Sequence, residues 1–200
     1  MKIISGSLKG RNIPFTPAKF RNAETTPQKI KEALFSILGE TLEEKSFLDL
    51  YGCSGQIGLE ALSRGAALTV INESDTRRFR FLAGLAESWN LSKRLLLVNM
   101  PASRCLKLLR TRGLFFDYVY LDPPYPRENE TFFYRKAIEE VGQSGLTGQD
   151  TVLIVQHRDG VVPPEKAGDC RCTRTRKYGS NALSCYEFID GETSPPRQRE

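Results

Sequence analysis

The strongest constraint on the fold is a regular alternation of strand and helix patterns that begins at residue 46. Short apolar runs, typical of buried strands, alternate with longer segments in which apolar residues recur at helical spacing. Because the two patterns alternate, we expect an α/β fold with a mostly parallel sheet covered by helices on both faces. The expected elements lie at residues 46–50, 56–64, 68–72, 76–89, 95–99, 102–111, 116–121, 131–141 and 151–156.

The C-terminal part of the chain predicts a different arrangement. Residues 171–178 and 183–189 read as two strands joined by a turn at 179–181, and we expect them to close the sheet as an antiparallel hairpin. The chain is accordingly divided into three parts. These are a basic N-terminal arm and helix at 1–40, a main domain at 41–190 and a flexible tail at 191–200.

Within the N-terminal part, residues 2–5 and 12–15 predict two short strands outside the core. Thr26 precedes a run with helical spacing that ends at Gly39, so we expect the Thr26 side chain to cap that helix. Residues 1–31 contain seven lysines and arginines against the single acid Glu24. Such clustering favours binding to a nucleic-acid backbone, although a solvated charged segment has the same composition. The candidate RNA contacts are Lys2, Lys9, Arg11, Lys19 and Arg21.

Composition limits the other classes of function. No apolar run approaches the roughly 20 residues of a membrane span, and the N-terminus lacks the apolar core of a secretory signal. Five cysteines without framework spacing suit reduced thiols, so we expect a cytoplasmic protein. We also expect a monomer. Cys170 and Cys172 suggest a metal site, but a second cysteine pair is missing and His157 is the single histidine, which favours no metal.

A turn of small residues follows the first expected strand, between Asp49 and Gly55. Ligands approach the backbone at such turns in doubly wound sheets, where the next helix presents its N-terminal N–H groups. Glu73 ends the second strand 24 residues after Asp49, close to the spacing of a carboxylate that binds ribose hydroxyls. A turn that binds no ligand and a glutamate on the surface would each give the same signal. The turn and the glutamate at this spacing together predict an adenosine-containing ligand.

The most specific motif is Asp122-Pro123-Pro124-Tyr125, at the end of an apolar strand. Prolines fix the backbone and remove its N–H donors, which leaves the carbonyls free to accept hydrogen bonds. The exocyclic amine of a base is a weak nucleophile because its lone pair is delocalised into the ring. Asp122 and the Pro123 carbonyl can accept its hydrogens while Tyr125 stacks on the ring, so the motif predicts a site that aligns a base amine with a methyl donor. The alternative is a rigid structural turn.

With these motifs the chain resembles the RsmD-type family of 16S ribosomal RNA guanine-N2 methyltransferases. The likeness extends from Met1 to about Phe188. It is carried by residues 1–11, 31–38, 57–66, 122–125 and 178–187.

The resemblance implies a Rossmann-like methyltransferase fold, S-adenosyl-L-methionine as the methyl donor, and a guanine amine of 16S rRNA or of an assembling small ribosomal subunit as acceptor. It implies catalytic roles for Asp122, Pro123 and Tyr125. The residues implied to hold the donor are Asp49, Tyr51, Gly52, Cys53, Ser54, Gly55, Glu73 and Ala102.

The chain departs from the family pattern at three places. In the turn after the first strand, Gly52 stands where a small residue such as alanine is usual and Cys53 replaces a usual glycine. Pro101 replaces an acid that holds the adenine amine, and residues 23–25 read Ala-Glu-Thr where the family has Arg-Pro-Thr. These departures motivate a second hypothesis, an RNA-binding or ribosome-assembly factor with little or no activity. A third is a methyltransferase for another nucleic-acid amine, such as adenine N6.

Overall fold

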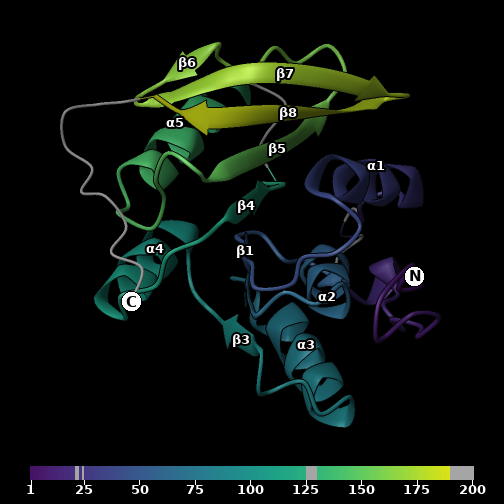
Figure 1. Cartoon of the computed structure of the whole chain (residues 1–200). Coiled ribbons are helices and arrows are strands. Elements are labelled where there is room, and N and C mark those ends of the chain that lie inside the picture. Colours follow the sequence, from purple (N-terminus) through teal and green to yellow (C-terminus); the bar gives the residue numbers. More distant parts are fainter. Residues whose placement is uncertain (21–22, 24, 125–129, 190–200) are drawn as a thin grey trace.

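A computed structural model describes residues 1–20, 23, 25–124 and 130–189. The strands within these residues form one eight-stranded sheet in the order β3-β2-β1-β4-β5-β8-β7-β6 (Figure 1). The strands are β1 (Ser46–Asp49), β2 (Leu68–Asn72), β3 (Leu95–Val98), β4 (Tyr118–Leu121), β5 (Val152–Arg158), β6 (Lys166–Ala167), β7 (Cys170–Tyr178) and β8 (Asn181–Phe188). The helices are η1 (Pro17–Phe20), α1 (Gln28–Leu38), α2 (Gln56–Ser63), α3 (Thr76–Ser88), α4 (Ala102–Thr111) and α5 (Glu130–Gly142).

The first five strands are parallel, and the last three add to them as antiparallel neighbours. The chain runs from β1 outward through β2 to β3, then crosses back to place β4 on the other side of β1. This reversal creates a switch point between β1 and β4, where open α/β sheets bind ligands beyond the carboxyl ends of the strands. The predicted parallel sheet with a closing hairpin is confirmed.

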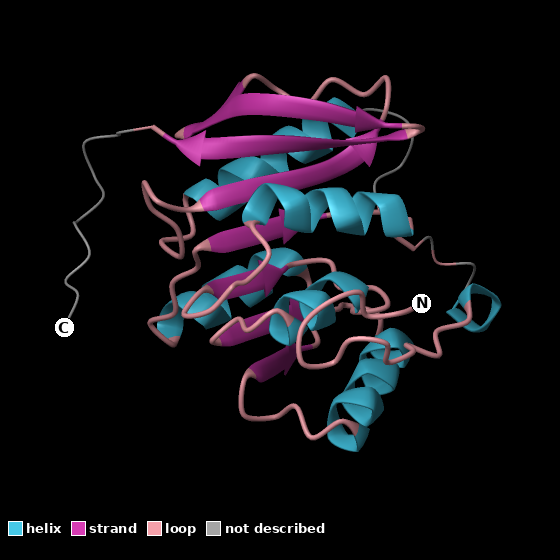
Figure 2. Cartoon of the chain, turned by 45° about the vertical axis from the view of Figure 1, so that its right-hand side comes forward, coloured by secondary structure: helices cyan, strands magenta, loops and turns pink. Residues whose placement is uncertain are grey.

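Helices cover both faces of the parallel strands, because alternate residues of each strand point to opposite sides. Leu48 and Val119 belong to the apolar cluster shared with α4 and α5, and Phe47 and Tyr120 belong to the cluster beneath α1 and α2. Figure 2 shows α1 lying across the front of the sheet, with β7 and β8 above it. Every helix among the described residues is too short or too polar to cross a bilayer.

The prediction of two short strands in the N-terminal segment is wrong. Only an isolated bridge between Lys2 and Asn12 forms there. The backbone N–H groups of Ile4 and Ser5 donate instead to the carboxylate of Glu60 in α2, at 2.8 and 3.0 Å. Pairing with a buried carboxylate removes the donors that a strand ladder would need, and it ties the N-terminal segment to α2.

The prediction that the Thr26 side chain caps the first helix is also wrong. The residue before α1 is Pro27, and no side chain makes a capping hydrogen bond there. The hydroxyl of Thr26 points to Asp122 instead.

Strand β6 was not predicted from the sequence, because a strand of two residues is too short to show a periodic pattern. The tail at 191–200 lies outside the described residues.

Candidate active site

The carboxyl ends of the parallel strands open onto a cavity of about 710 Å³. Its wall includes Glu73 after β2, Asp122 and Pro123 after β4, and residues of the turn after β1. A much smaller pocket adjoins it and is lined by Asp49, Gly52 and Ser54 as well as by Asp122. The described residues that the sequence assigned to donor binding and chemistry therefore gather in one region, apart from Gly55, which caps α2 behind the turn.

The turn between β1 and α2 has a backbone that favours glycine. Gly55 adopts a φ of 74° and Cys53 a φ of 47°, both in the left-handed region. A Cβ atom at Gly52 would come within 2.3 Å of the Ile71 side chain, so this position accepts only glycine without rearrangement. Cys53 is a non-glycine residue held in a conformation that costs roughly 1 kcal/mol or more.

Glu73 anchors that turn from the neighbouring strand. Glu73 is 4% exposed, and its carboxylate accepts hydrogen bonds from the N–H of Cys53 at 2.9 Å and the N–H of Asp75 at 2.6 Å. Arg78 of α3 adds an ion pair at 3.0 Å. A carboxylate accepts about four hydrogen bonds, so three donors leave limited capacity for a ligand.

Asp49 is buried at the end of β1. Its Oδ2 accepts the N–H of Gly58 at 3.1 Å, and its Oδ1 meets no donor in hydrogen-bond geometry among the described residues. Burial raises the pKa of Asp49 to about 7. The backbone N–H groups of Gly58 and Tyr51 oppose the rise, and the charges of Asp122 and Glu73 add to it. Three acidic side chains thus share a low-dielectric region that favours a cationic ligand.

Asp122 is held from the segment that precedes α1. The hydroxyl of Thr26 donates to Asp122 Oδ2 at 3.3 Å, and the Thr26 carbonyl accepts the side-chain amide of Gln56 at 2.7 Å. Pro123 is buried and Pro124 is exposed. Tyr125, the proposed stacking residue, lies outside the described residues.

One wall of the cavity comes from residues that the sequence did not assign to it. Gln156 Oε1 accepts the hydroxyl of Tyr120, and His157 is fixed between the Arg158 carbonyl at 2.9 Å and the Ser184 hydroxyl at 2.8 Å. Burial lowers the pKa of His157, which keeps its ring neutral near pH 7. A carbonyl only accepts, so Nδ1 carries the proton and Nε2 accepts from Ser184.

The positions of these residues in the sequence contained a signal that could have identified them. Residues 156–158 end β5, so the rule that ligands bind at the carboxyl ends of parallel strands could have found them. The further lining residues without a sequence assignment are Phe20, Ala23, Thr25, Pro27, Leu50, Asn72, Ser74, Arg78, Pro124, Tyr134 and Asn181. Phe20 is held by stacking on Phe15, with ring centroids 4.4 Å apart, and by edge contact with Phe81.

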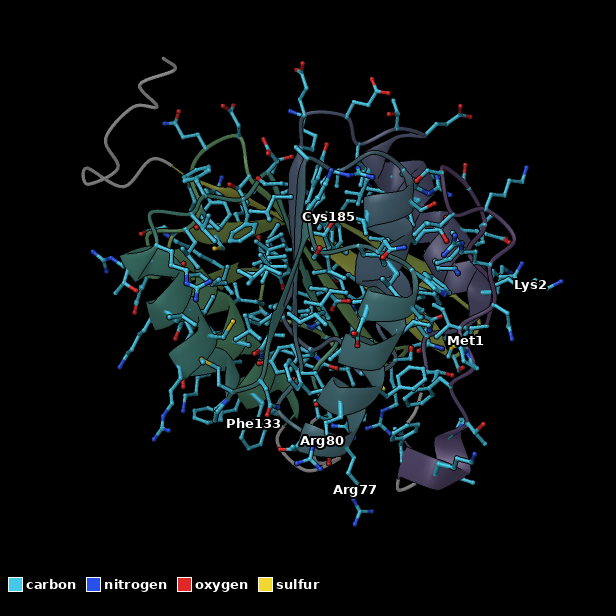
Figure 3. All side chains as sticks on the ribbon, turned by 90° about the horizontal axis from the view of Figure 1, so that it is seen from below. Met1, Lys2, Arg77, Arg80, Phe133 and Cys185 are labelled. Carbon is cyan, nitrogen blue, oxygen red and sulfur yellow. The ribbon has the colours of Figure 1, made fainter. Side chains whose placement is uncertain are left out.

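The candidate RNA contacts lie apart from the cavity lining. Lys2, Lys9, Arg11 and Lys19 are exposed, and Arg21 lies outside the described residues. Lys2 extends away from the body of the protein (Figure 3). The guanidinium of Arg11 lies 5.1 Å from the ring centre of Trp89. In the described part of the chain, no three His, Cys, Asp or Glu side chains are placed to hold a metal ion.

Known proteins resemble this chain over nearly its whole length. A family model described as Conserved hypothetical protein 95 matches residues 1–187. Ribosomal RNA small subunit methyltransferase D of Escherichia coli strain K12 is 30% identical over 192 residues, which cover 94% of this chain and 89% of that protein. The chain belongs to the RsmD family. Membership in the RsmD family confirms the resemblance that the five sequence segments suggested.

Solved structures define the fold of this RsmD family member further. A hypothetical protein of Thermus thermophilus superposes with a TM-score of 0.75 at 26% identity, covering 94% of this chain and 99% of that chain. An RNA methyltransferase of Salinibacter ruber, solved in complex with S-adenosyl-L-homocysteine, has a TM-score of 0.61 at 14% identity and covers 88% and 100%. The fold is the Rossmann-like fold of S-adenosylmethionine-dependent methyltransferases, as predicted.

Proposed function

We propose that this protein transfers a methyl group from S-adenosyl-L-methionine to ribosomal RNA, and that its acceptor is the exocyclic N2 amine of a guanine in 16S rRNA. The observation that carries the proposal is the convergence of Asp49, Glu73 and Asp122 on one region at the carboxyl ends of β1, β2 and β4. The Escherichia coli relative is named ribosomal RNA small subunit methyltransferase D, which supports ribosomal RNA of the small subunit as the substrate.

The residues present fit this donor. Bound S-adenosyl-L-methionine supplies a methyl group on a positively charged sulfonium, and the acidic surroundings of the cavity complement that charge. The backbone N–H of Tyr51 acts on the Asp49 carboxylate, but the buried Oδ1 meets no donor in full hydrogen-bond geometry among the described residues, so it is able to accept a hydrogen bond from a ligand ammonium group. Glu73 retains capacity to accept a ribose hydroxyl beside the turn at Gly52 and Cys53.

The proposed chemical roles lie on the acceptor side. Asp122, steadied by Thr26, accepts a hydrogen of the amine, and the Pro123 carbonyl accepts the other. These two bonds aim the nitrogen lone pair at the methyl carbon, and Tyr125 is proposed to stack on the base. Alignment then supplies most of the acceleration, and the amine proton leaves to Asp122 or to solvent after transfer.

A second candidate is an RNA-binding factor with little or no methyl transfer. Two observations favour it: the strained backbone of Cys53 in the donor turn, and the ion pair that occupies part of Glu73. Both would weaken donor binding without affecting RNA contacts elsewhere.

Calorimetric titration with S-adenosyl-L-methionine, repeated in the presence of 16S rRNA, separates the two candidates. Donor binding followed by transfer of labelled methyl groups to rRNA or small subunits is the expected result. Digestion of the product to nucleosides then identifies the acceptor base. N2-methylguanosine is the expected product, whereas N6-methyladenosine would show that the acceptor is adenine and not guanine. Absence of donor binding by the folded protein under both conditions would reject the methyltransferase.

A further inference from the structure

Three arginines share one face of β7. Arg171, Arg174 and Arg176 are all exposed, and they pair across the ladder with Glu187, Cys185 and Leu183 of β8. The three partners are alternate residues of β8 and therefore lie on one face. A bulge between Cys172 and Arg174 shifts the register by one residue, which brings Arg171 onto the face of the other two.

The face of the sheet that carries the three arginines is the face on which α1 packs. Leu183 and Cys185 belong to the apolar cluster beneath α1. Burial raises the pKa of the Cys185 thiol, and the charges of Arg174 and Arg176 oppose that rise, as expected for guanidinium groups close to the thiol. Figure 2 shows that α1 leaves the front of β7 uncovered. The arginines are therefore open to solvent on this side.

The arginine face continues to the cavity. Tyr178 pairs with Asn181, and Asn181 pairs with Arg158, so these three side chains lie on the same face at the carboxyl end of β5. Asn181 and Arg158 both line the cavity. Alternate residues of a strand are about 7 Å apart, so Arg176 and Arg174 follow Tyr178 in successive steps away from the cavity.

The face carries three arginines against the single carboxylate of Glu187, which lies opposite Arg171, among the residues of β7 and β8 that share it. Within the described part of the chain, no ion pair involves Arg171, Arg174 or Arg176. Lys177 gives the contrast, because it lies on the opposite face and pairs with Asp159 at 2.8 Å. Unpaired guanidinium groups in a row suit the regularly spaced phosphates of an extended RNA strand, which they can bind through two parallel hydrogen bonds each.

We propose that Arg171, Arg174 and Arg176 bind the phosphate backbone of the RNA strand that flanks the nucleotide held in the cavity. The inference rests on the proposed function and adds a second RNA surface to the basic N-terminal segment. Contacts to phosphates fix the register of the RNA on the protein, while the cavity selects the base. The RNA strand would leave the cavity past Asn181 and follow β7.

The test compares R171Q/R174Q/R176Q with a charge-matched control, K93Q/K107Q/R112Q, whose three residues are also exposed but lie in the loop before β3 and on or just after α4. Binding of 16S rRNA is measured by filter retention across a salt series. We expect the β7 variant to bind at least tenfold more weakly near 0.1 M salt. Its slope of log affinity against log salt should be smaller by about 2, because three phosphate contacts each contribute about 0.7 on single strands.

Retention of wild-type affinity and slope by the β7 variant would overturn the inference. An equal loss in the control would also do so, because net charge alone would then explain it, and so would absence of rRNA binding by the wild type. Donor calorimetry on the same proteins separates this inference from the proposed function. Normal donor binding with an unchanged salt slope rejects only the β7 surface, whereas absent donor binding with a reduced slope rejects only the methyltransferase.

Discussion

The hydroxyl of Thr26 donates a hydrogen bond to Oδ2 of Asp122 at 3.3 Å, although the two residues are 96 positions apart in the chain. Thr26 lies just before α1, and Asp122 follows β4 at the centre of the sheet. The bond therefore links the N-terminal segment, which carries the basic residues, to the carboxylate proposed to hold the acceptor amine. At 3.3 Å the bond is long for a hydroxyl donor, so it contributes about 1.5 kcal/mol, the lower end of the range for hydrogen bonds to charged groups.

Thr26→Val keeps the shape of the side chain and removes the donor. We expect the rate constant of methyl transfer to fall roughly tenfold, because Asp122 loses one of the contacts that orient it. Donor affinity measured by calorimetry should stay the same. Thr26→Ser, which keeps the hydroxyl, should retain most of the activity; equal rates for the valine and serine variants would contradict the positioning role.

Asp122→Ala removes the proposed acceptor of the amine hydrogen. Methyl transfer should fall by orders of magnitude while the fold and the donor affinity change little, because Asp122 aligns the base and the carboxylates of Asp49 and Glu73 remain to complement the donor's charge. Single-turnover transfer of labelled methyl groups measures the change. Wild-type activity in this variant would exclude the assigned role.

Cys53→Gly should bind the donor more tightly. Cys53 has a φ of 47°, where a Cβ atom is strained, and its side chain lines the cavity. Glycine relieves the strain and enlarges the donor turn. Calorimetry with S-adenosyl-L-homocysteine tests this expectation, with Cys53→Ala as the control that keeps the Cβ atom. A weaker complex for the glycine variant would show that the thiol contributes to binding.

Donor binding should strengthen as the pH rises from 5 to 7 and then level off. The pKa of Asp49 is raised to about 7 in the folded protein, so a cationic ligand must displace its proton below that pH. The gain should be at most about tenfold per pH unit for one proton. Calorimetry in buffers of different ionisation enthalpy counts the released proton. Asp49→Asn should lose this dependence, and its persistence in that variant would contradict the assignment to Asp49.

The same shift affects stability in the opposite direction. The pKa of Asp49 is about 7 in the fold and about 3.9 when unfolded, so between these values the folded state binds more protons than the unfolded state. The contribution of Asp49 to the free energy of unfolding is therefore complete below about pH 4 and is lost as the pH rises to about 7. Urea denaturation across this range should show a flatter profile for Asp49→Asn.

Glu60→Ala should lower the free energy of unfolding by about 3–5 kcal/mol, the usual cost of removing one partner from a buried ion pair. Glu60 is fully buried, with Lys31 at 3.3 Å and Arg64 at 3.0 Å, and it also binds the N-terminal backbone. Urea denaturation measures the change. Glu32→Ala on the exposed side of α1 is the control and should change stability by less than about 0.5 kcal/mol; similar losses in both variants would contradict the prediction.

The sequence by itself determined the class of fold and the strand ends at which the motifs lie. Apolar periodicity, the glycines of the turn after β1 and the prolines after β4 are local signals, because each acts on its own segment of backbone. These signals placed Asp49, Glu73 and Asp122 at the ends of separate strands. The carboxyl ends of parallel strands share one edge of a sheet, so these positions are compatible with a common site.

Tertiary structure alone decided which partners these residues meet. Thr26 had the signature of a helix cap, yet its hydroxyl binds Asp122, because both groups were brought together by packing of α1 against the sheet. The common face of Arg171 and Arg174 depends on a bulge of one residue, and a shift of one residue moves a side chain to the other side of a sheet. Such contacts arise from register and long-range packing, which no local pattern in the chain encodes.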